Sequence, residues 1–121
     1  MEPKKKIRRF EDLLVWQKAK ELGLLVYRVS GTGEFGKDYA LKNQIRRAVL
    51  SISSNIAEGQ GRMGPKSFRN YLSIANGSTY EVISQIHFAR DLGYLTPIEA
   101  EDILARCSEV SRMVKGLRNS V

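Results

Sequence analysis

Apolar residues recur at helical spacing in four segments of the chain, and no segment of real length alternates with the period of two typical of a strand. In the first segment, steps of four and three separate the apolar positions Val15, Ala19, Leu22, Val26 and Val29. Such steps place side chains on one face of a helix. The glycine-rich stretch 30–36 is predicted to end this helix, because glycines loosen the backbone restraint that a helix needs.

The second predicted helix carries an apolar stripe at Leu41, Ile45, Ala48, Ile52 and Ile56. Asp38 stands just before it as a predicted N-cap, because a carboxylate accepts hydrogen bonds from the unpaired amides of a first turn. The glycines at 59, 61 and 64 are predicted to end this helix. Pro65 then suits the first turn of a third helix, where its missing N–H has no partner to lose.

The third and fourth segments complete the pattern. The third stripe extends over about six turns, at Phe68, Leu72, Ala75, Thr79, Val82, Ile86 and Ala89. Thr96 and Glu99 have the spacing of a capping box that starts the fourth helix. The fourth stripe comprises Ile103, Cys107, Val110, Val114, Leu117 and Val121. Four amphipathic helices with short connections predict an all-α fold, an up-and-down antiparallel four-helix bundle over residues 10–121.

Composition excludes several classes of protein. The 121 residues are enough for one domain, and no apolar run approaches the roughly 20 residues of a membrane-spanning helix. Acidic residues follow the basic start of the chain where a signal peptide needs its apolar stretch. Cys107 has no second cysteine to pair with and is expected to act as a small apolar core side chain. We therefore expect a soluble, cytoplasmic protein without disulfides.

Positive charge is concentrated in two places. The net charge is +7, and the first nine residues hold five Lys or Arg against one Glu, which predicts a flexible basic arm over residues 1–9. A second concentration lies between residues 37 and 69. Clustered cations favour contact with nucleic acid phosphates. The candidate contacts are Lys4, Lys5, Lys6, Arg8, Arg9, Arg46, Arg47, Arg62, Lys66 and Arg69. The alternative is that the arm and the basic surface are only hydrated and contact no nucleic acid.

Two glycine-rich stretches, 31–36 and 59–64, match the dinucleotide pattern G-x-G-x-x-G. That pattern binds phosphates where a strand leads into a helix, whereas each of these stretches follows a predicted helix. They are interpreted as turns between helices. A weaker phosphate contact at the start of the third helix stays open, because helix N-termini favour anions.

Polar residues also occur at the spacing of a buried stripe on the second and third helices. They are Gln44, Ser51, Asn55, Glu58, Ser78, Glu81 and Gln85. Polar groups at such positions need partners. One interpretation is a hydrogen-bond network between helices that fixes their register; the other is a polar pocket or a subunit contact. A di-iron bundle needs about four carboxylates and paired Glu-x-x-His elements, which this pattern does not supply.

Catalytic groups have little support in the sequence. The single histidine, His87, has no acid or nucleophile that the sequence identifies as its partner. We therefore expect no enzymatic activity, no metal and no cofactor.

Several blocks of residues are distinctive. The first half of the chain contains Phe10-x-x-Leu13-x-Val15-Trp16-Gln17-x-Ala19, Leu41-x-x-Gln44-Ile45-Arg46-Arg47-Ala48 and Asn55-Ile56-Ala57-Glu58-Gly59. The second half contains Phe68-x-x-Tyr71-Leu72-x-Ile74-Ala75-x-Gly77-Ser78-x-x-Glu81 and Leu92-Gly93-Tyr94-Leu95. From Phe10 onward the chain resembles a bacterial four-helix-bundle family, the proteins encoded within intervening sequences of 23S ribosomal RNA genes. It departs from the family pattern at Ser53, where proline is expected, and at Thr79-Tyr80, where the family tends towards leucine.

The resemblance implies an assembly and a partner class. It implies a homo-oligomeric ring, a homopentamer, with no established enzymatic activity and no assigned catalytic residues. It also implies kinship with the accessory proteins of diversity-generating retroelements, which bind nucleic acid and a reverse transcriptase through a basic surface. The leading hypothesis is a non-enzymatic oligomer that binds RNA or DNA phosphates. The alternative is a structural or protein-interaction module with no nucleic-acid role.

Overall fold

The computed structural model describes residues 9–62 and 64–121, and every regular element in this part of the chain is helical. The all-α prediction is therefore confirmed. The elements are the 3-10 helix η1 (Phe10–Asp12) and the α-helices α1 (Leu14–Ser30), α2 (Gly33–Lys37), α3 (Tyr39–Gly61), α4 (Pro65–Asp91) and α5 (Pro97–Ser120).

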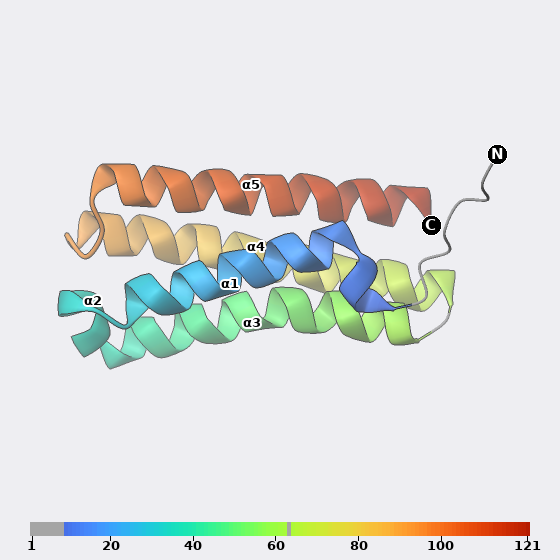
Figure 1. Cartoon of the computed structure of the whole chain (residues 1–121), viewed down its shortest axis with the longest axis horizontal. Helices are drawn as coiled ribbons and strands as arrows, with labels where there is room; N and C mark the ends of the chain where they lie inside the picture. Colours follow the sequence, from blue (N-terminus) through green and yellow to red (C-terminus); the bar gives the residue numbers. More distant parts are fainter. Residues whose placement is uncertain (1–8, 63) are drawn as a thin grey trace.

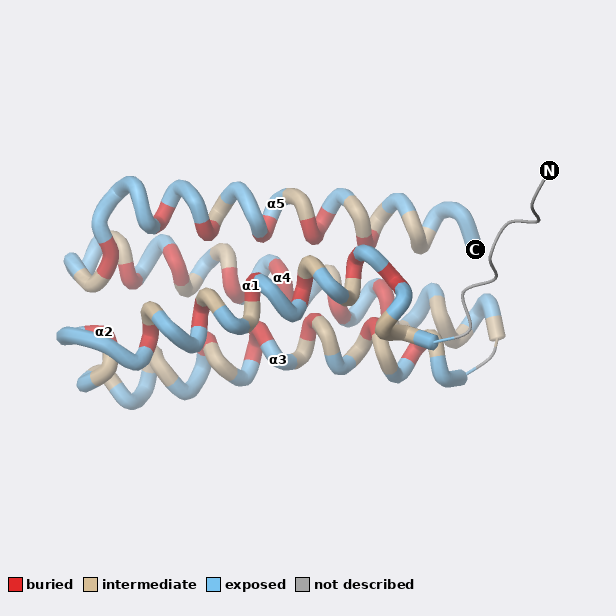
Figure 2. The backbone as a smooth tube through the Cα atoms, viewed as in Figure 1, coloured by how far each residue is buried: buried red, intermediate tan, exposed pale blue. Residues whose placement is uncertain are grey.

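The four long helices lie side by side along the long axis of the molecule (Figure 1). α3 packs against both α1 and α4, and α5 packs against α4 and α1. The short helix α2 lies at one end of this group and contacts α3 (Figure 1). Buried residues line the sides of the long helices that face one another, and exposed residues cover the outside (Figure 2).

The predicted helix starts are confirmed. The Asp38 carboxylate accepts a 3.0 Å hydrogen bond from the Leu41 amide and caps α3. α4 begins at Pro65. At the start of α5 the Thr96 hydroxyl accepts from the Glu99 amide at 3.1 Å, and the Glu99 carboxylate accepts from the Thr96 amide at 2.9 Å. This reciprocal pair satisfies two amides that have no partner within the helix.

The stretch 30–36 differs from the prediction, because it contains most of α2 rather than only a loop. Gly33 has a φ of 58°, a left-handed conformation that glycine adopts without steric cost. The turn brings Phe35 into the core, where it is fully buried. Its ring centroid lies 5.5 Å from that of Tyr94, whose hydroxyl donates to the Asp38 carboxylate at 2.9 Å. Burial of Phe35 therefore holds α2 against the turn between α4 and α5.

The predicted apolar stripes form the core of the molecule. Most of their members are buried, and Val29, Leu41, Phe68 and Leu117 are half-buried against them. Val121 is the exception, since 37% of it is exposed. The fully buried large side chains include Leu22, Ile45, Ile52, Ile56, Leu72, Ile86 and Ile103. Burial of each such side chain contributes roughly 1.5–3 kcal/mol, so these contacts dominate the stability of the fold.

α3 and α4 pack closely at Gly59, near the end of α3. A Cβ atom at this position would lie 2.8 Å from the Cβ of Tyr71 and 3.0 Å from Cδ1 of Phe68. Real Cβ atoms essentially never come closer than 3.0 Å to such neighbours. Gly59 thus allows the two aromatic residues of α4 to pack directly on the backbone of α3.

We expect Gly59→Ala to lower the free energy of unfolding by about 1–3 kcal/mol, because the added methyl overpacks this contact. Gly77→Ala is the matched control: Gly77 lies inside α4 with nothing within 4 Å of the added Cβ. Alanine there should raise the free energy of unfolding by about 0.5–1 kcal/mol through helix propensity. Denaturant titrations of both variants measure the difference. Equal effects at the two sites would contradict close packing at Gly59.

Burial raises the pKa of the Cys107 thiol from 9.0 to about 12. The thiolate is the reactive form, so native protein at neutral pH should resist alkylation. We expect iodoacetamide to modify Cys107 only after denaturant unfolds the chain, with mass spectrometry as the readout. Rapid labelling of the native protein would show that the thiol is open to solvent.

Candidate nucleic-acid interface

The N-terminal cations fall mostly outside the part of the chain that the structure describes. Lys4, Lys5, Lys6 and Arg8 lie outside the described residues. Arg9 is exposed, and its guanidinium lies 2.6 Å from the Glu11 carboxylate. This ion pair raises the pKa of Arg9 and lowers that of Glu11. The neighbouring acid therefore offsets the positive charge of Arg9.

Arg46 and Arg47 are adjacent in sequence but have different surroundings. Arg46 is half-buried, and its guanidinium donates to the Ser30 hydroxyl and to the Tyr27 carbonyl, both at 2.9 Å. It also lies 4.5 Å from the centroid of the Tyr27 ring. These contacts satisfy carbonyl and hydroxyl groups at the end of α1 and join α1 to α3. Arg47 is exposed, with no ion pair found within the described residues.

The third group of predicted cations lies where α3 ends and α4 begins. Arg62 forms a 2.8 Å ion pair with Glu58 and lies 5.6 Å from the centroid of the Tyr71 ring. Arg69 is exposed and donates to the main-chain oxygen of Val121 at 2.9 Å. Lys66 is exposed and has no acidic partner in the part of the chain that the structure describes. Among the described residues, Arg62 is the member of this group that pairs with an acidic side chain.

A further set of cations on α5 was not predicted from the sequence. The Lys115 ammonium donates to the Tyr80 hydroxyl at 3.0 Å, and the Arg118 guanidinium to the Ser73 hydroxyl at 3.4 Å. Arg112 is exposed beside them on the same helix. We call Ser73, Tyr80, Arg112, Lys115 and Arg118 the α4–α5 ridge. The sequence did hold a signal for it, since residues 110–121 carry three cations and no acid.

The predicted polar set separates into a buried part and an exposed part. The hydroxyls of Ser51 on α3 and Ser78 on α4 lie 2.8 Å apart. The Asn55 amide donates to the Ser51 carbonyl at 2.7 Å and to its hydroxyl at 2.9 Å. The structure thus brings these three residues together at the α3–α4 contact. Sequence reasoning missed the related bond from Ser111 on α5 to Asn76 on α4, at 2.8 Å.

The remaining members of that set lie elsewhere. Gln44, Glu58 and Glu81 are exposed, and Glu58 is held by Arg62. Gln85 is half-buried, and its side-chain oxygen is buried without a hydrogen-bond partner among the described residues. The structure therefore does not join all seven residues into one network.

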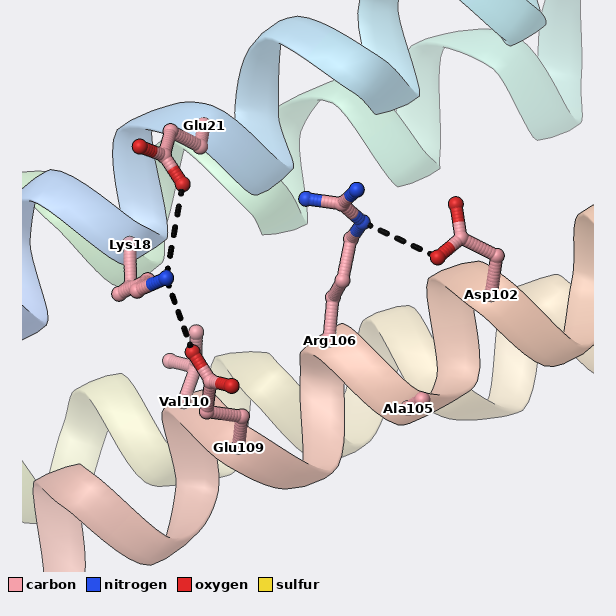
Figure 3. Close-up of a pocket in the computed structure, with 7 residues that line it drawn as sticks. All are labelled: Lys18, Glu21, Asp102, Ala105, Arg106, Glu109 and Val110. Atoms are coloured by element: carbon pink, nitrogen blue, oxygen red, sulfur yellow. Dashed lines mark hydrogen bonds and ion pairs between the residues drawn. The ribbon is translucent and has the colours of Figure 1, made fainter.

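A hollow of about 280 Å³ lies between α1 and α5 (Figure 3). The Lys18 ammonium bridges Glu21 of α1 at 4.0 Å and Glu109 of α5 at 3.5 Å. Arg106 pairs with Asp102 at 3.3 Å along α5. All five side chains are substantially exposed, so each pair contributes only about 0–1 kcal/mol. This hollow is a seam of two cations and three carboxylates, in which both cations are paired with acids and the net charge is −1.

Side chains of types used in catalysis occur together in one hollow on α4. Ser84, His87 and Asp91 line one hollow on α4, but within the described residues no hydrogen bond joins any two of them. No group of three or more His, Cys, Asp or Glu in residues 9–62 and 64–121 is arranged to hold a metal ion. The first glycine-rich stretch follows α1, whereas the second begins within the last turn of α3, so its first three residues are helical and not a turn as expected. The described chain has no strand to build a dinucleotide-binding turn. None of its helices is long and apolar enough to cross a membrane.

Comparison with known proteins shows the family. The family model of the 23S rRNA-intervening sequence protein matches residues 11–116. The chain belongs to this family. Among solved structures, it is similar to a protein of unknown function from the S23 ribosomal protein family of Bacteroides thetaiotaomicron. The TM-score is 0.80 at 22% identity, and the match covers 87% of this chain and 98% of that one. This likeness concerns the fold alone. No curated protein matches the chain.

The block Asn55-Ile56-Ala57-Glu58-Gly59, which suggested the 23S rRNA-intervening sequence family, has a structural role here. Asn55 bonds to Ser51, and Ile56 is fully buried. Glu58 pairs with Arg62, and Gly59 admits the aromatic residues of α4. Within this block, Gly59 is the residue that packs against the side chains of α4.

Proposed function

We propose that this protein is a non-enzymatic homo-oligomer that binds nucleic acid through phosphate contacts made by exposed Lys and Arg residues. The observation that supports it most is the state of the surface cations: Arg47, Lys66 and Arg112 are exposed without an acidic partner among the described residues. A cation that is already paired with a carboxylate contributes less binding free energy when it contacts a phosphate. Unpaired cations release the counterions of the polyanion and so favour its binding.

The proposed scaffold is an up-and-down antiparallel four-helix bundle. In support, the sequence colours run in opposite directions along successive long helices (Figure 1). Such a bundle presents the outer faces of all four helices to solvent. The basic residues at 4, 5, 6 and 8 add four positive charges to the chain. The net charge of +7 suits a polyanionic partner.

Homo-oligomerisation, in a ring of five copies, is part of the proposal. It is supported by large apolar side chains left on the surface. Leu24 and Leu50 are each about half exposed and line an apolar groove of about 220 Å³ between α1 and α3. Phe88 on α4 and Leu92, which follows α4, are more than half exposed. Exposed apolar patches mark surfaces that bind other proteins. A second protein, such as a reverse transcriptase, is a candidate occupant of the same surfaces.

Removing exposed cations that lack an acidic side-chain partner among the described residues should weaken binding to every nucleic acid sequence alike. For the triple variant Arg47→Gln, Lys66→Gln, Arg69→Gln we expect weaker binding of labelled RNA and a flatter salt dependence. The slope of log K against log salt should fall by about 0.7–0.9 for each phosphate that the variant no longer neutralises. The control is Lys37→Gln, Arg90→Gln, Arg106→Gln, which removes the same charge from residues that are paired with Glu34, Asp91 and Asp102.

Fluorescence anisotropy at several salt concentrations measures both variants. The proposal fails if the unaltered protein does not bind RNA or DNA at low salt, or if its binding is insensitive to salt. Equally weakened binding in the two triple variants would show that total charge matters and that the particular residues do not.

Light scattering tests the oligomer. The chain has a mass of 13.7 kDa, and we expect a particle of about five times this mass that persists on dilution. Leu24→Glu combined with Leu50→Glu should shift the mass downwards if the α1–α3 groove is a subunit contact. A monomer at all concentrations would remove the ring from the proposal.

A further inference from the structure

Tyr80 is an exposed aromatic ring among cations. Its neighbour Thr79 is fully buried, whereas 51% of Tyr80 is exposed on the side of α4 that faces α5. The Lys115 Nζ lies 3.0 Å from the Tyr80 hydroxyl but 5.4 Å from the ring centroid. The ammonium is thus at the hydroxyl end of the ring and not over its centre. About half of Tyr80 is exposed, so part of its ring is accessible to a flat ligand.

The two other exposed tyrosines with a neighbouring cation, Tyr27 and Tyr39, differ from Tyr80. The Arg46 guanidinium lies 4.5 Å from the centroid of Tyr27. The Lys42 ammonium lies 4.8 Å from the centroid of Tyr39. Within the described chain, neither cation donates a hydrogen bond to the hydroxyl of its ring. These two cations lie nearer the centre of their ring than Lys115 does, and Lys115 instead contacts Tyr80 most closely at the hydroxyl.

The cations of the ridge are held in place by uncharged groups. Lys115 donates to a phenol and Arg118 to the Ser73 hydroxyl. A neutral acceptor restrains the long side chain but leaves its charge uncompensated, unlike the Arg62–Glu58 or Arg106–Asp102 pairs. Arg112, Lys115 and Arg118 follow one another at three-residue steps and so span about 9 Å of α5. The ridge therefore presents three positive charges over a short distance.

We propose that the α4–α5 ridge binds single-stranded nucleic acid, with one base stacked on Tyr80 and the adjacent phosphates held by Arg112, Lys115 and Arg118. This inference rests on the proposed function and names the form of nucleic acid that the protein takes. An aromatic side chain beside cations is the combination that single-strand binders use, because every base has a face that can stack. Paired and stacked bases within a duplex offer no free face to Tyr80.

The test compares two probes on the full chain: a labelled oligouridine of about twelve nucleotides, and an RNA duplex of the same length. For Tyr80→Ala we expect oligouridine affinity to fall about five- to a hundred-fold, the range for removal of one base–aromatic stack. Duplex affinity should change less than about twofold. Tyr80→Phe keeps the ring and should retain most of the single-strand affinity. The matched control is Tyr39→Ala, which removes another exposed tyrosine beside a lysine and should have little effect.

The cations of the ridge are tested separately. Arg112→Gln, Lys115→Gln, Arg118→Gln should weaken single-strand binding and lower the salt slope by about two. Circular dichroism confirms that each variant is folded. If the unaltered protein binds neither probe, the proposed function fails. Suppose that the unaltered protein binds oligouridine, and that Tyr80→Ala and the triple variant bind it equally well. The ridge is then not the binding site, although the proposal of nucleic-acid binding stands. Tighter binding of the duplex would overturn the preference for single strands.

Discussion

The contact between α3 and α4 is the interaction on which the rest of the structure depends. Gly59 lets Phe68 and Tyr71 pack directly against the backbone of α3, and the Ser51–Ser78 hydrogen bond satisfies two polar groups within the same contact. Apolar burial supplies the larger stabilisation there, and the hydroxyl pair is expected to fix the register because a shifted pairing would leave both groups without partners. α1 then packs on α3, and α5 on α4.

This packing decides which charges are available to a partner. Buried residues lie on the facing sides of the helices and exposed residues on the outside (Figure 2). Among the exposed cations of the described chain, some pair with a carboxylate and others do not. The seam between α1 and α5 is an example of compensation, since Lys18 there bridges two acids. The α4–α5 ridge is the opposite case, because uncharged side chains hold Lys115 and Arg118. The cations of this chain are thus paired with acids on one surface and left without acidic partners on the other.

The sequence predicted local features better than contacts between distant residues. The caps at Asp38 and Thr96 and the start at Pro65 involve residues within three positions of one another, so their signals are local. The five-residue helix α2 is too short to show periodicity. Arg46 could not be recognised as a link to α1, because its partners lie 16 and 19 residues away. Glu81 has core-like spacing but is exposed, since spacing defines a face of a helix without saying what covers it. The cations of α5 could be recognised as a candidate binding surface only from the fold, which places Lys115 beside Tyr80.

The central claim is that uncompensated cations on a packed helical scaffold hold a nucleic acid. Ultraviolet crosslinking of the full chain to RNA in cells, with mass spectrometry of the crosslinked peptides, tests it most directly. The account predicts recovered RNA and crosslinked nucleotides on peptides from α4 and the second half of α5, with Tyr80 among the modified residues. The account would be contradicted if no RNA were recovered, or if the crosslinks mapped only to the compensated seam between α1 and α5.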